Sequence, residues 1–71
     1  YGGPSITAED FKLVGDLFAV GVKSYDGHWV IGDQVAIKQN GKVTGVGIAK
    51  MNPEEMISMG RGLAVEVRHH A

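Results

Sequence analysis

The chain has 71 residues, no cysteine and a formal net charge of −1. This length supports one hydrophobic core, so we expect a single domain over residues 1–71, and no apolar run approaches the ~20 residues that a membrane span needs. The lack of cysteine excludes disulfides and thiolate metal sites and favours a cytoplasmic setting. The weak net charge argues against a nucleic-acid binder that relies strongly on electrostatic attraction.

The first four residues, YGGP, are rich in turn formers, and we interpret residues 1–4 as a linker. Because the chain begins with Tyr1 and not Met, we expect a domain excised from a longer protein. Five of the seven lysines and arginines fall in residues 38–71. A mildly basic second half is compatible with polyanion contact, although random scatter of so few charges explains it about as well.

The next segment predicts a short helix that ends near Gly15. Thr7 and Asp10 form a pair that resembles a capping box, and apolar residues follow at helical spacing (Ala8, Phe11 and Val14). We also consider a short strand over residues 5–7.

Residues 16–23 alternate in the way a half-buried strand does. Phe18, Val20 and Val22 share one face, which we expect to be buried. Gly21 interrupts the strand interior, and such a glycine marks either a bulge or a close approach by another backbone or a ligand.

Residues 24–33 contain two turn signals, Asp26-Gly27 and Gly32-Asp33. We therefore expect a loop, anchored by Trp29 and Ile31. A single Trp between turns is more often the plug of a small core than a base-stacking platform.

A hairpin follows over residues 34–50. Asn40-Gly41 is the strongest two-residue hairpin signal, and Val35 and Ile37 are expected to face inward. The returning strand carries Val46 and Ile48 on one face, while its other face is nearly bare (Val43, Gly45, Gly47 and Ala49). The bare face predicts that a second layer packs closely against it.

A second helix and a final strand complete the chain. Asn52 and Glu55 form a capping box around Pro53, and Gly60 ends the helix, which we expect to bury Met56 and Met59. In residues 61–71, Leu63, Val65 and Val67 alternate with Ala64, Glu66 and Arg68, which predicts an edge or surface strand. The fold class is therefore mostly β with two short helices, in a small, strongly bent barrel.

Five segments in this order resemble the PUA domain, the RNA-binding module named after pseudouridine synthases and archaeosine transglycosylases. The resemblance runs from about Ile6 to His69, with Val20 where the family usually has proline. The matching segments are Leu17-Phe18-Ala19-Val20-Gly21-Val22, Gly32-Asp33-Gln34-Val35, Gly45-Val46-Gly47-Ile48-Ala49, Pro53-Glu54-Glu55-Met56, and Arg61-Gly62 with Val65-Glu66-Val67-Arg68-His69.

The resemblance implies a PUA-like pseudobarrel that is closed by the second helix. It also implies a non-catalytic module, without cofactor, that recognises structured RNA such as tRNA- or rRNA-like stems through backbone and shape. Its parent is expected to be an RNA-modifying enzyme or a translation-associated factor, with a neighbouring domain as a second partner. The family positions that face RNA correspond here to Gly21, Val22, Lys23, Arg61, Gly62 and Arg68.

Three other roles compete with RNA binding. The alternative to RNA binding is a structural or protein-interaction barrel that positions a neighbouring domain, which the net charge and Val20 favour. A metal site built from His28, His69 and His70 is disfavoured, because adjacent strand histidines point to opposite faces. Glu54 and Glu55 do not face each other on a helix, so they do not form a catalytic carboxylate pair.

Overall fold

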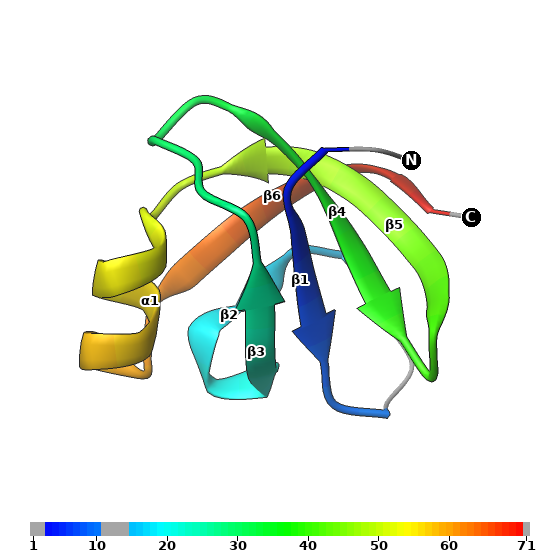
Figure 1. Cartoon of the computed structure of the whole chain (residues 1–71), viewed down its shortest axis with the longest axis horizontal. Coiled ribbons are helices and arrows are strands. Elements are labelled where there is room, and N and C mark those ends of the chain that lie inside the picture. The colour runs from blue at the N-terminus through cyan, green and yellow to red at the C-terminus, as the bar shows by residue number, and fades with distance from the viewer. Residues whose placement is uncertain (1–2, 11–14, 71) are drawn as a thin grey trace.

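Six strands form one curved sheet in the order β2-β6-β5-β4-β1-β3 (Figure 1). The structure is a computed structural model, and it describes residues 3–10 and 15–70. The elements are β1 (Ser5–Ala8), β2 (Leu17–Phe18), the 3-10 helix η1 (Ala19–Gly21), β3 (Val22–Asp26), β4 (Gln34–Gln39), β5 (Lys42–Ala49), α1 (Pro53–Met59) and β6 (Leu63–His70). In this part of the chain no helix is long and apolar enough to cross a membrane.

The sheet curls because its two edge strands are consecutive in the chain. β2 pairs with β6 and β3 pairs with β1, while η1 alone separates β2 from β3. Strand β1 lies between β3 and β4 and runs parallel to β4. The result is a half-barrel with α1 at one side, as the resemblance implied (Figure 1). The prediction of two short helices was only partly right, since the described residues contain one α-helix and one 3-10 turn.

The expected start of the first helix is a strand. Thr7 and Ala8 belong to β1, where Thr7 pairs with Ser24 and Lys38. Ile6 and Ala8 are buried in the core, so pairing on both sides and burial outweigh the local capping pattern. The possible strand over residues 5–7 is confirmed. The remainder of the predicted helix includes residues 11–14, which lie outside the described residues.

The predicted strand over residues 16–23 is interrupted, and of the three residues expected on its buried face only Val22 packs against the core. Leu17 and Ala19 are buried, whereas Phe18 and Val20 are 54% and 78% exposed. Leu17 pairs with Val65 on β6, which turns it inward, and η1 then breaks the period of two. Residues 24–26, expected in a loop, continue β3.

Trp29 fills the centre of the half-barrel, as predicted. Its side chain is 1% exposed, its Nε1 donates to the Met51 carbonyl at 2.7 Å, and its ring meets Tyr25 edge-on at 5.5 Å. Ile31 is not an anchor, because it is 59% exposed in the turn that follows. Among the described residues, the core consists of Ile6, Ala8, Leu17, Ala19, Trp29, Val35, Ile37, Ala49, Met56, Ala64 and Val65.

The hairpin β4–β5 has the predicted turn and orientation. Asn40 and Gly41 both have positive φ, 52° and 76°, as a type I′ turn requires. Val35 and Ile37 are fully buried. The strand that lies closely against Gly47 is β6, which is paired with β5 in the same sheet and is not the separate second layer that was expected.

Helix α1 begins and ends as predicted. The Asn52 side chain accepts from the Glu55 amide at 2.7 Å, the Glu55 carboxylate accepts from the Asn52 amide at 3.4 Å, and Gly60 is left-handed with φ 65°. Met56 is buried, but Met59 is 52% exposed. The helix has only seven residues, so only a narrow stripe of it faces the core.

We expect Asn52→Ala to destabilise the domain by about 1 kcal/mol, because it leaves the Glu55 amide without its capping acceptor. Urea denaturation followed by far-UV circular dichroism measures the loss. Asn52→Asp keeps an acceptor oxygen and should stay within a few tenths of a kcal/mol of the parent. An Asp variant as unstable as the Ala variant would contradict the capping role.

Candidate functional site

Five of the six residues implied as the RNA-facing positions lie at one end of the half-barrel. Gly21, Val22 and Lys23 are contiguous across η1 and β3, and the Ala19 amide donates to the Gly62 carbonyl at 2.8 Å. This bond places Arg61 and Gly62 beside η1. We call these five residues the η1 end. Lys23 and Arg61 are exposed there, and Gly21 and Val22 are half-buried.

Two backbone features shape the η1 end. The first is a β-bulge: Val22 pairs with Ala8 and Ser24 pairs with Thr7, which leaves Lys23 as the unpaired extra residue. A bulge re-aims the side chain of its extra residue, so Lys23 is presented independently of the strand's alternation. The second is Gly62, whose φ of 94° is one that other residues rarely adopt.

Arg68 lies away from the η1 end. It lies five positions along β6 from Leu63, roughly 16 Å at ~3.3 Å per residue. It is the extra residue of another bulge, since Val67 pairs with Gly47 and His69 pairs with Val46. Its guanidinium contacts the Glu66 carboxylate at 2.9 Å, and Lys50 approaches the same carboxylate at 3.7 Å. Lys23, Arg61 and Arg68 therefore do not form one contiguous basic patch.

Strand β6 is covered along only part of its length. The sequence predicts an edge or surface strand here, but β6 lies between β5 and β2 in the sheet. Strand β2 is short, and it pairs only with Leu63 and Val65 of β6. Further along, the Val67 amide donates to the Asp16 carboxylate at 3.1 Å. A side chain thus takes the place of a strand partner at this point.

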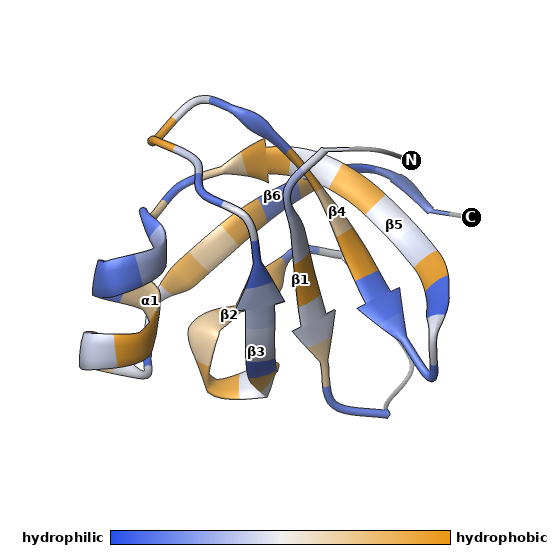
Figure 2. Cartoon of the chain, viewed as in Figure 1, coloured by the Kyte–Doolittle hydropathy of each residue, from blue (hydrophilic) through white to orange (hydrophobic). Residues whose placement is uncertain are grey.

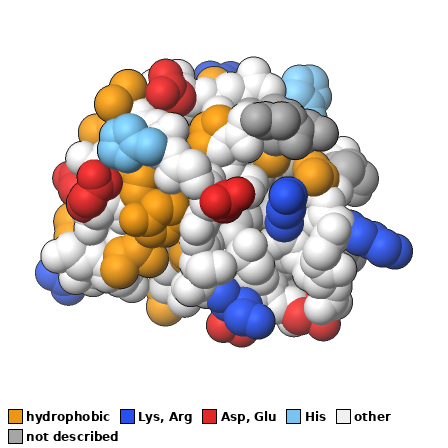
Figure 3. Space-filling view, in the orientation of Figure 1, with side chains coloured by type: hydrophobic (Ala, Val, Ile, Leu, Met, Phe, Trp, Pro, Cys, Tyr) orange, Lys and Arg blue, Asp and Glu red, His pale blue; other side chains and the backbone are white. Residues whose placement is uncertain are grey.

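The η1 end is flanked by exposed apolar side chains. Phe18, Val20, Ile57 and Met59 are each more than half exposed, on β2, η1 and α1. Figure 2 shows hydrophobic colour on both η1 and α1. In Figure 3, hydrophobic side chains gather between α1 and β3, whereas the visible Lys and Arg side chains are dispersed. The surface is therefore mixed apolar and basic, and strong electrostatic attraction is not expected from it.

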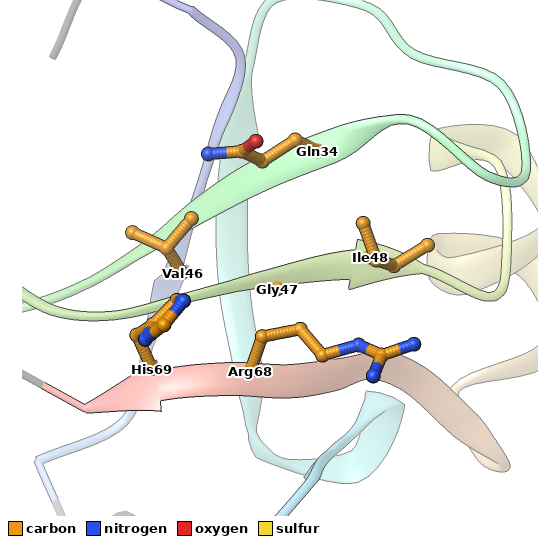
Figure 4. A pocket seen from close by; sticks show the side chains of 6 residues that line it. All are labelled: Gln34, Val46, Gly47, Ile48, Arg68 and His69. Atoms are coloured by element: carbon orange, nitrogen blue, oxygen red, sulfur yellow. The ribbon is translucent and has the colours of Figure 1, made fainter.

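A cavity of about 190 Å³ opens on the outer face of β4, β5 and β6. Figure 4 shows Gln34 on one side, Arg68 on the other, and Val46, Ile48 and His69 around Gly47; these six residues line it. Val46 and Ile48 share a face, as their alternation in the sequence predicts. The proximity of Gln34, Arg68 and His69 to them was not predicted, because it depends on the register of three strands.

The described residues contain no group of three or more His, Asp or Glu side chains that could hold a metal ion. In particular, His69 and His70 are neighbours on β6 and pair with Val46 and Gly45. As neighbours on one strand they point to opposite faces.

Comparison with protein families gives one match, the model of the PUA domain, over residues 7–71. Archaeosine synthase subunit alpha from Thermococcus kodakarensis is 48% identical over 59 residues, which cover 83% of this chain and 10% of that protein. The corresponding subunit from Thermoplasma acidophilum is 38% identical over 63 residues, 89% of this chain and 12% of that protein. The chain thus spans about a tenth of the length of these curated relatives.

Solved structures share the fold. NSun6 from Pyrococcus horikoshii is 36% identical with a TM-score of 0.84, and the match covers 94% of this chain and 19% of that one. The archaeal box H/ACA sRNP Nop10–Cbf5 complex contains a chain that is 27% identical with a TM-score of 0.90, over 97% of this chain and 24% of that one.

Proposed function

This chain belongs to the PUA domain family, and from that membership we propose that it is a non-catalytic module that binds structured RNA through its backbone and shape. The observation that carries the proposal is the family match over residues 7–71, together with relatives that are much longer than this chain and match it over about a tenth of their length. A tRNA- or rRNA-like stem is the proposed ligand. Any catalytic step would then belong to other domains of a longer parent.

We place the main RNA contact at the η1 end. Gly21 lacks a side chain and lets a sugar-phosphate backbone approach, while the exposed Lys23 and Arg61 supply positive charge beside it. Gly62 keeps the Arg61 backbone next to η1 through the bond from Ala19. Arg68 is a separate, outlying contact. With few basic groups, binding should be weak and sensitive to salt.

We expect Arg61→Ala to weaken binding of an RNA stem about fivefold, with little loss of stability, because an exposed arginine contributes mainly its charge and its planar set of donors. The slope of log K against log salt concentration should also become shallower by about one unit, which corresponds to the loss of one phosphate contact. Titration of the labelled chain with an RNA stem at several salt concentrations, followed by NMR, measures both changes.

Lys42→Ala is the matched control for Arg61→Ala. Lys42 is also exposed, but it lies at the β4–β5 turn. We expect no change in RNA affinity from it. Equal losses from both variants would indicate diffuse electrostatics, and no loss from Arg61→Ala would remove Arg61 from the site. Absence of any shift at the η1 end at low salt would reject RNA binding by the isolated chain.

The second candidate function is a barrel that positions a neighbouring domain. The exposed apolar residues Phe18, Val20, Ile57 and Met59 favour it, because apolar side chains gathered on adjacent elements mark contact surfaces more often than isolated ones do. Val20→Ser separates the two functions. It should leave affinity for an RNA stem unchanged if this surface contacts protein, and it should lower that affinity if the surface contacts RNA.

A further inference from the structure

The cavity on the outer face of β4, β5 and β6 is distinct from the η1 end. Its floor is Gly47, which is buried, and Val46 and Ile48 rise on either side of this residue because alternate side chains of a strand share a face. Figure 4 shows the Gln34 side chain along the β4 side and the Arg68 side chain along the β6 side. The cavity therefore has apolar walls within strand β5 and polar groups on the two neighbouring strands.

The polar groups offer both donors and acceptors. Gln34, which already has a partner within the chain, contributes a carboxamide whose three hydrogen-bonding sites exceed what one partner uses, and His69 contributes an imidazole. Arg68 contributes a guanidinium with five N–H donors. Its contact with Glu66 at 2.9 Å fixes one end of this group, and donors remain for a second acceptor.

Arg68 is the one Lys or Arg side chain among the described residues that line the cavity. It shares the Glu66 carboxylate with Lys50. Because two cations share this carboxylate, the Arg68 guanidinium keeps N–H donors for an anionic group next to the cavity. The bulge between Val46 and Gly47 contributes to this arrangement, because it makes Arg68 the extra residue on β6.

The size and chemistry of the cavity restrict its ligand. About 190 Å³ is below the ~300 Å³ at which drug-sized sites begin, so a single ring system fits better than a base pair or a folded peptide. Apolar walls suit the flat faces of an aromatic ring, and they do not suit a bare inorganic anion. The carboxamide and imidazole suit a ring with hydrogen-bonding edges. The Arg68 guanidinium suits an attached phosphate.

We propose that this cavity binds one unpaired nucleobase of a bound RNA, with Arg68 contacting an adjoining phosphate. The inference rests on the proposed RNA-binding function and assigns Arg68 to a second contact, separate from the η1 end. Val46 and Ile48 hold the ring, and Gln34 and His69 bond to its edge. A ligand engaged at both places spans the outer face of the sheet and the η1 end together.

The test compares ligands that differ in the base. The ¹⁵N-labelled chain is titrated with the four nucleoside 5′-monophosphates, with ribose 5-phosphate and with inorganic phosphate. We expect at least one nucleotide to shift the amides of Gly47, Ile48 and His69, and neither base-free compound to do so. Equal shifts from ribose 5-phosphate or phosphate would overturn the nucleobase assignment. Shifts confined to the η1 end would overturn the location.

A second titration uses one RNA stem in two forms, fully paired and with a single bulged-out nucleotide. The bulged form should bind at least about fivefold more tightly, and Arg68→Gln and Ile48→Glu should each abolish that difference. Lys38→Ala, on β4 outside the cavity, is the control and should preserve it. Equal affinity of the two forms for the parent chain would overturn the inference while leaving the proposed function intact. If neither form binds, the proposed RNA-binding function fails. The titration with mononucleotides then decides by itself whether the cavity binds a nucleobase.

Discussion

Trp29→Ala is expected to leave most of the chain unfolded at room temperature. Trp29 is the largest fully buried side chain, and it contacts both Tyr25 and the Met51 carbonyl. Truncating a buried Trp to alanine costs roughly 3–5 kcal/mol. The Met51 carbonyl also loses its donor, which adds about 1 kcal/mol or more if no water replaces the indole. Small domains have about 0.05–0.15 kcal/mol of stability per residue, so the loss is comparable to the whole.

Urea denaturation monitored by far-UV circular dichroism tests this expectation, because the signal does not depend on the indole that is removed. Trp29→Phe is the matched control. It keeps an aromatic ring in the core and loses the Nε1 donor, so we expect an intermediate loss of about 2 kcal/mol. A Trp29→Ala variant that stays within about 1 kcal/mol of the parent would show that Trp29 is not the centre of the core.

The hairpin and helix α1 could be predicted because their signals are local. Asn40-Gly41 supplies the two positive φ angles of the turn, and the Asn52–Glu55 pair supplies two reciprocal hydrogen bonds. Each signal is completed within four residues, so no distant contact overrides it. The burial of Val35, Ile37 and Met56 follows from the same elements and was also predicted correctly.

The strands near the N-terminus were harder to predict because partners far along the chain determine them. Thr7 carries a helix-start signal, yet it pairs with Ser24 and Lys38 and forms part of β1. Phe18 and Val20 follow the same alternation as buried residues, yet both are exposed, Phe18 on β2 beside the inward-facing Leu17 and Val20 within η1. A period of two shows that a segment has two faces, but it does not show which face is covered.

The candidate sites depend on irregularities that have no clear sequence signature. Lys23 and Arg68 are each the extra residue of a bulge, so alternation does not give the direction of their side chains. The resemblance named both residues, but it could not show that one lies at the η1 end and the other at the cavity. The proximity of Gln34 and His69 follows from pairing on the two sides of β5.

Gly47→Ala is the second large effect that we expect, with a loss of stability of about 3 kcal/mol. A Cβ at Gly47 would overlap the Glu66 carbonyl oxygen and would lie 2.8 Å from both Val65 Cγ1 and Val67 Cα. Two of these three atoms belong to the β6 backbone, which cannot move without breaking its pairing with β5. Overpacking typically costs about 1–3 kcal/mol, and a backbone obstacle places this substitution at the upper end.

Val46→Ala is the control for Gly47→Ala, since it places alanine at the neighbouring position of β5, where the side chain is half-buried on the outer face. It should cost about 1 kcal/mol or less, because it removes two partly exposed methyl groups. Equal losses from the two variants in urea denaturation would contradict the steric argument.

A double variant identifies which atoms of β6 block a side chain at position 47. Val65→Ala removes the Cγ1 contact but leaves the Glu66 carbonyl and Val67 Cα in place. If the backbone is the obstacle, adding Val65→Ala to Gly47→Ala recovers no stability and lowers it further, because Val65 is fully buried. A double variant more stable than Gly47→Ala would show that the Val65 side chain was the obstacle. In that case β5 and β6 could remain paired with a side chain between them, and the glycine would be required by packing against the Val65 side chain and not by the β6 backbone.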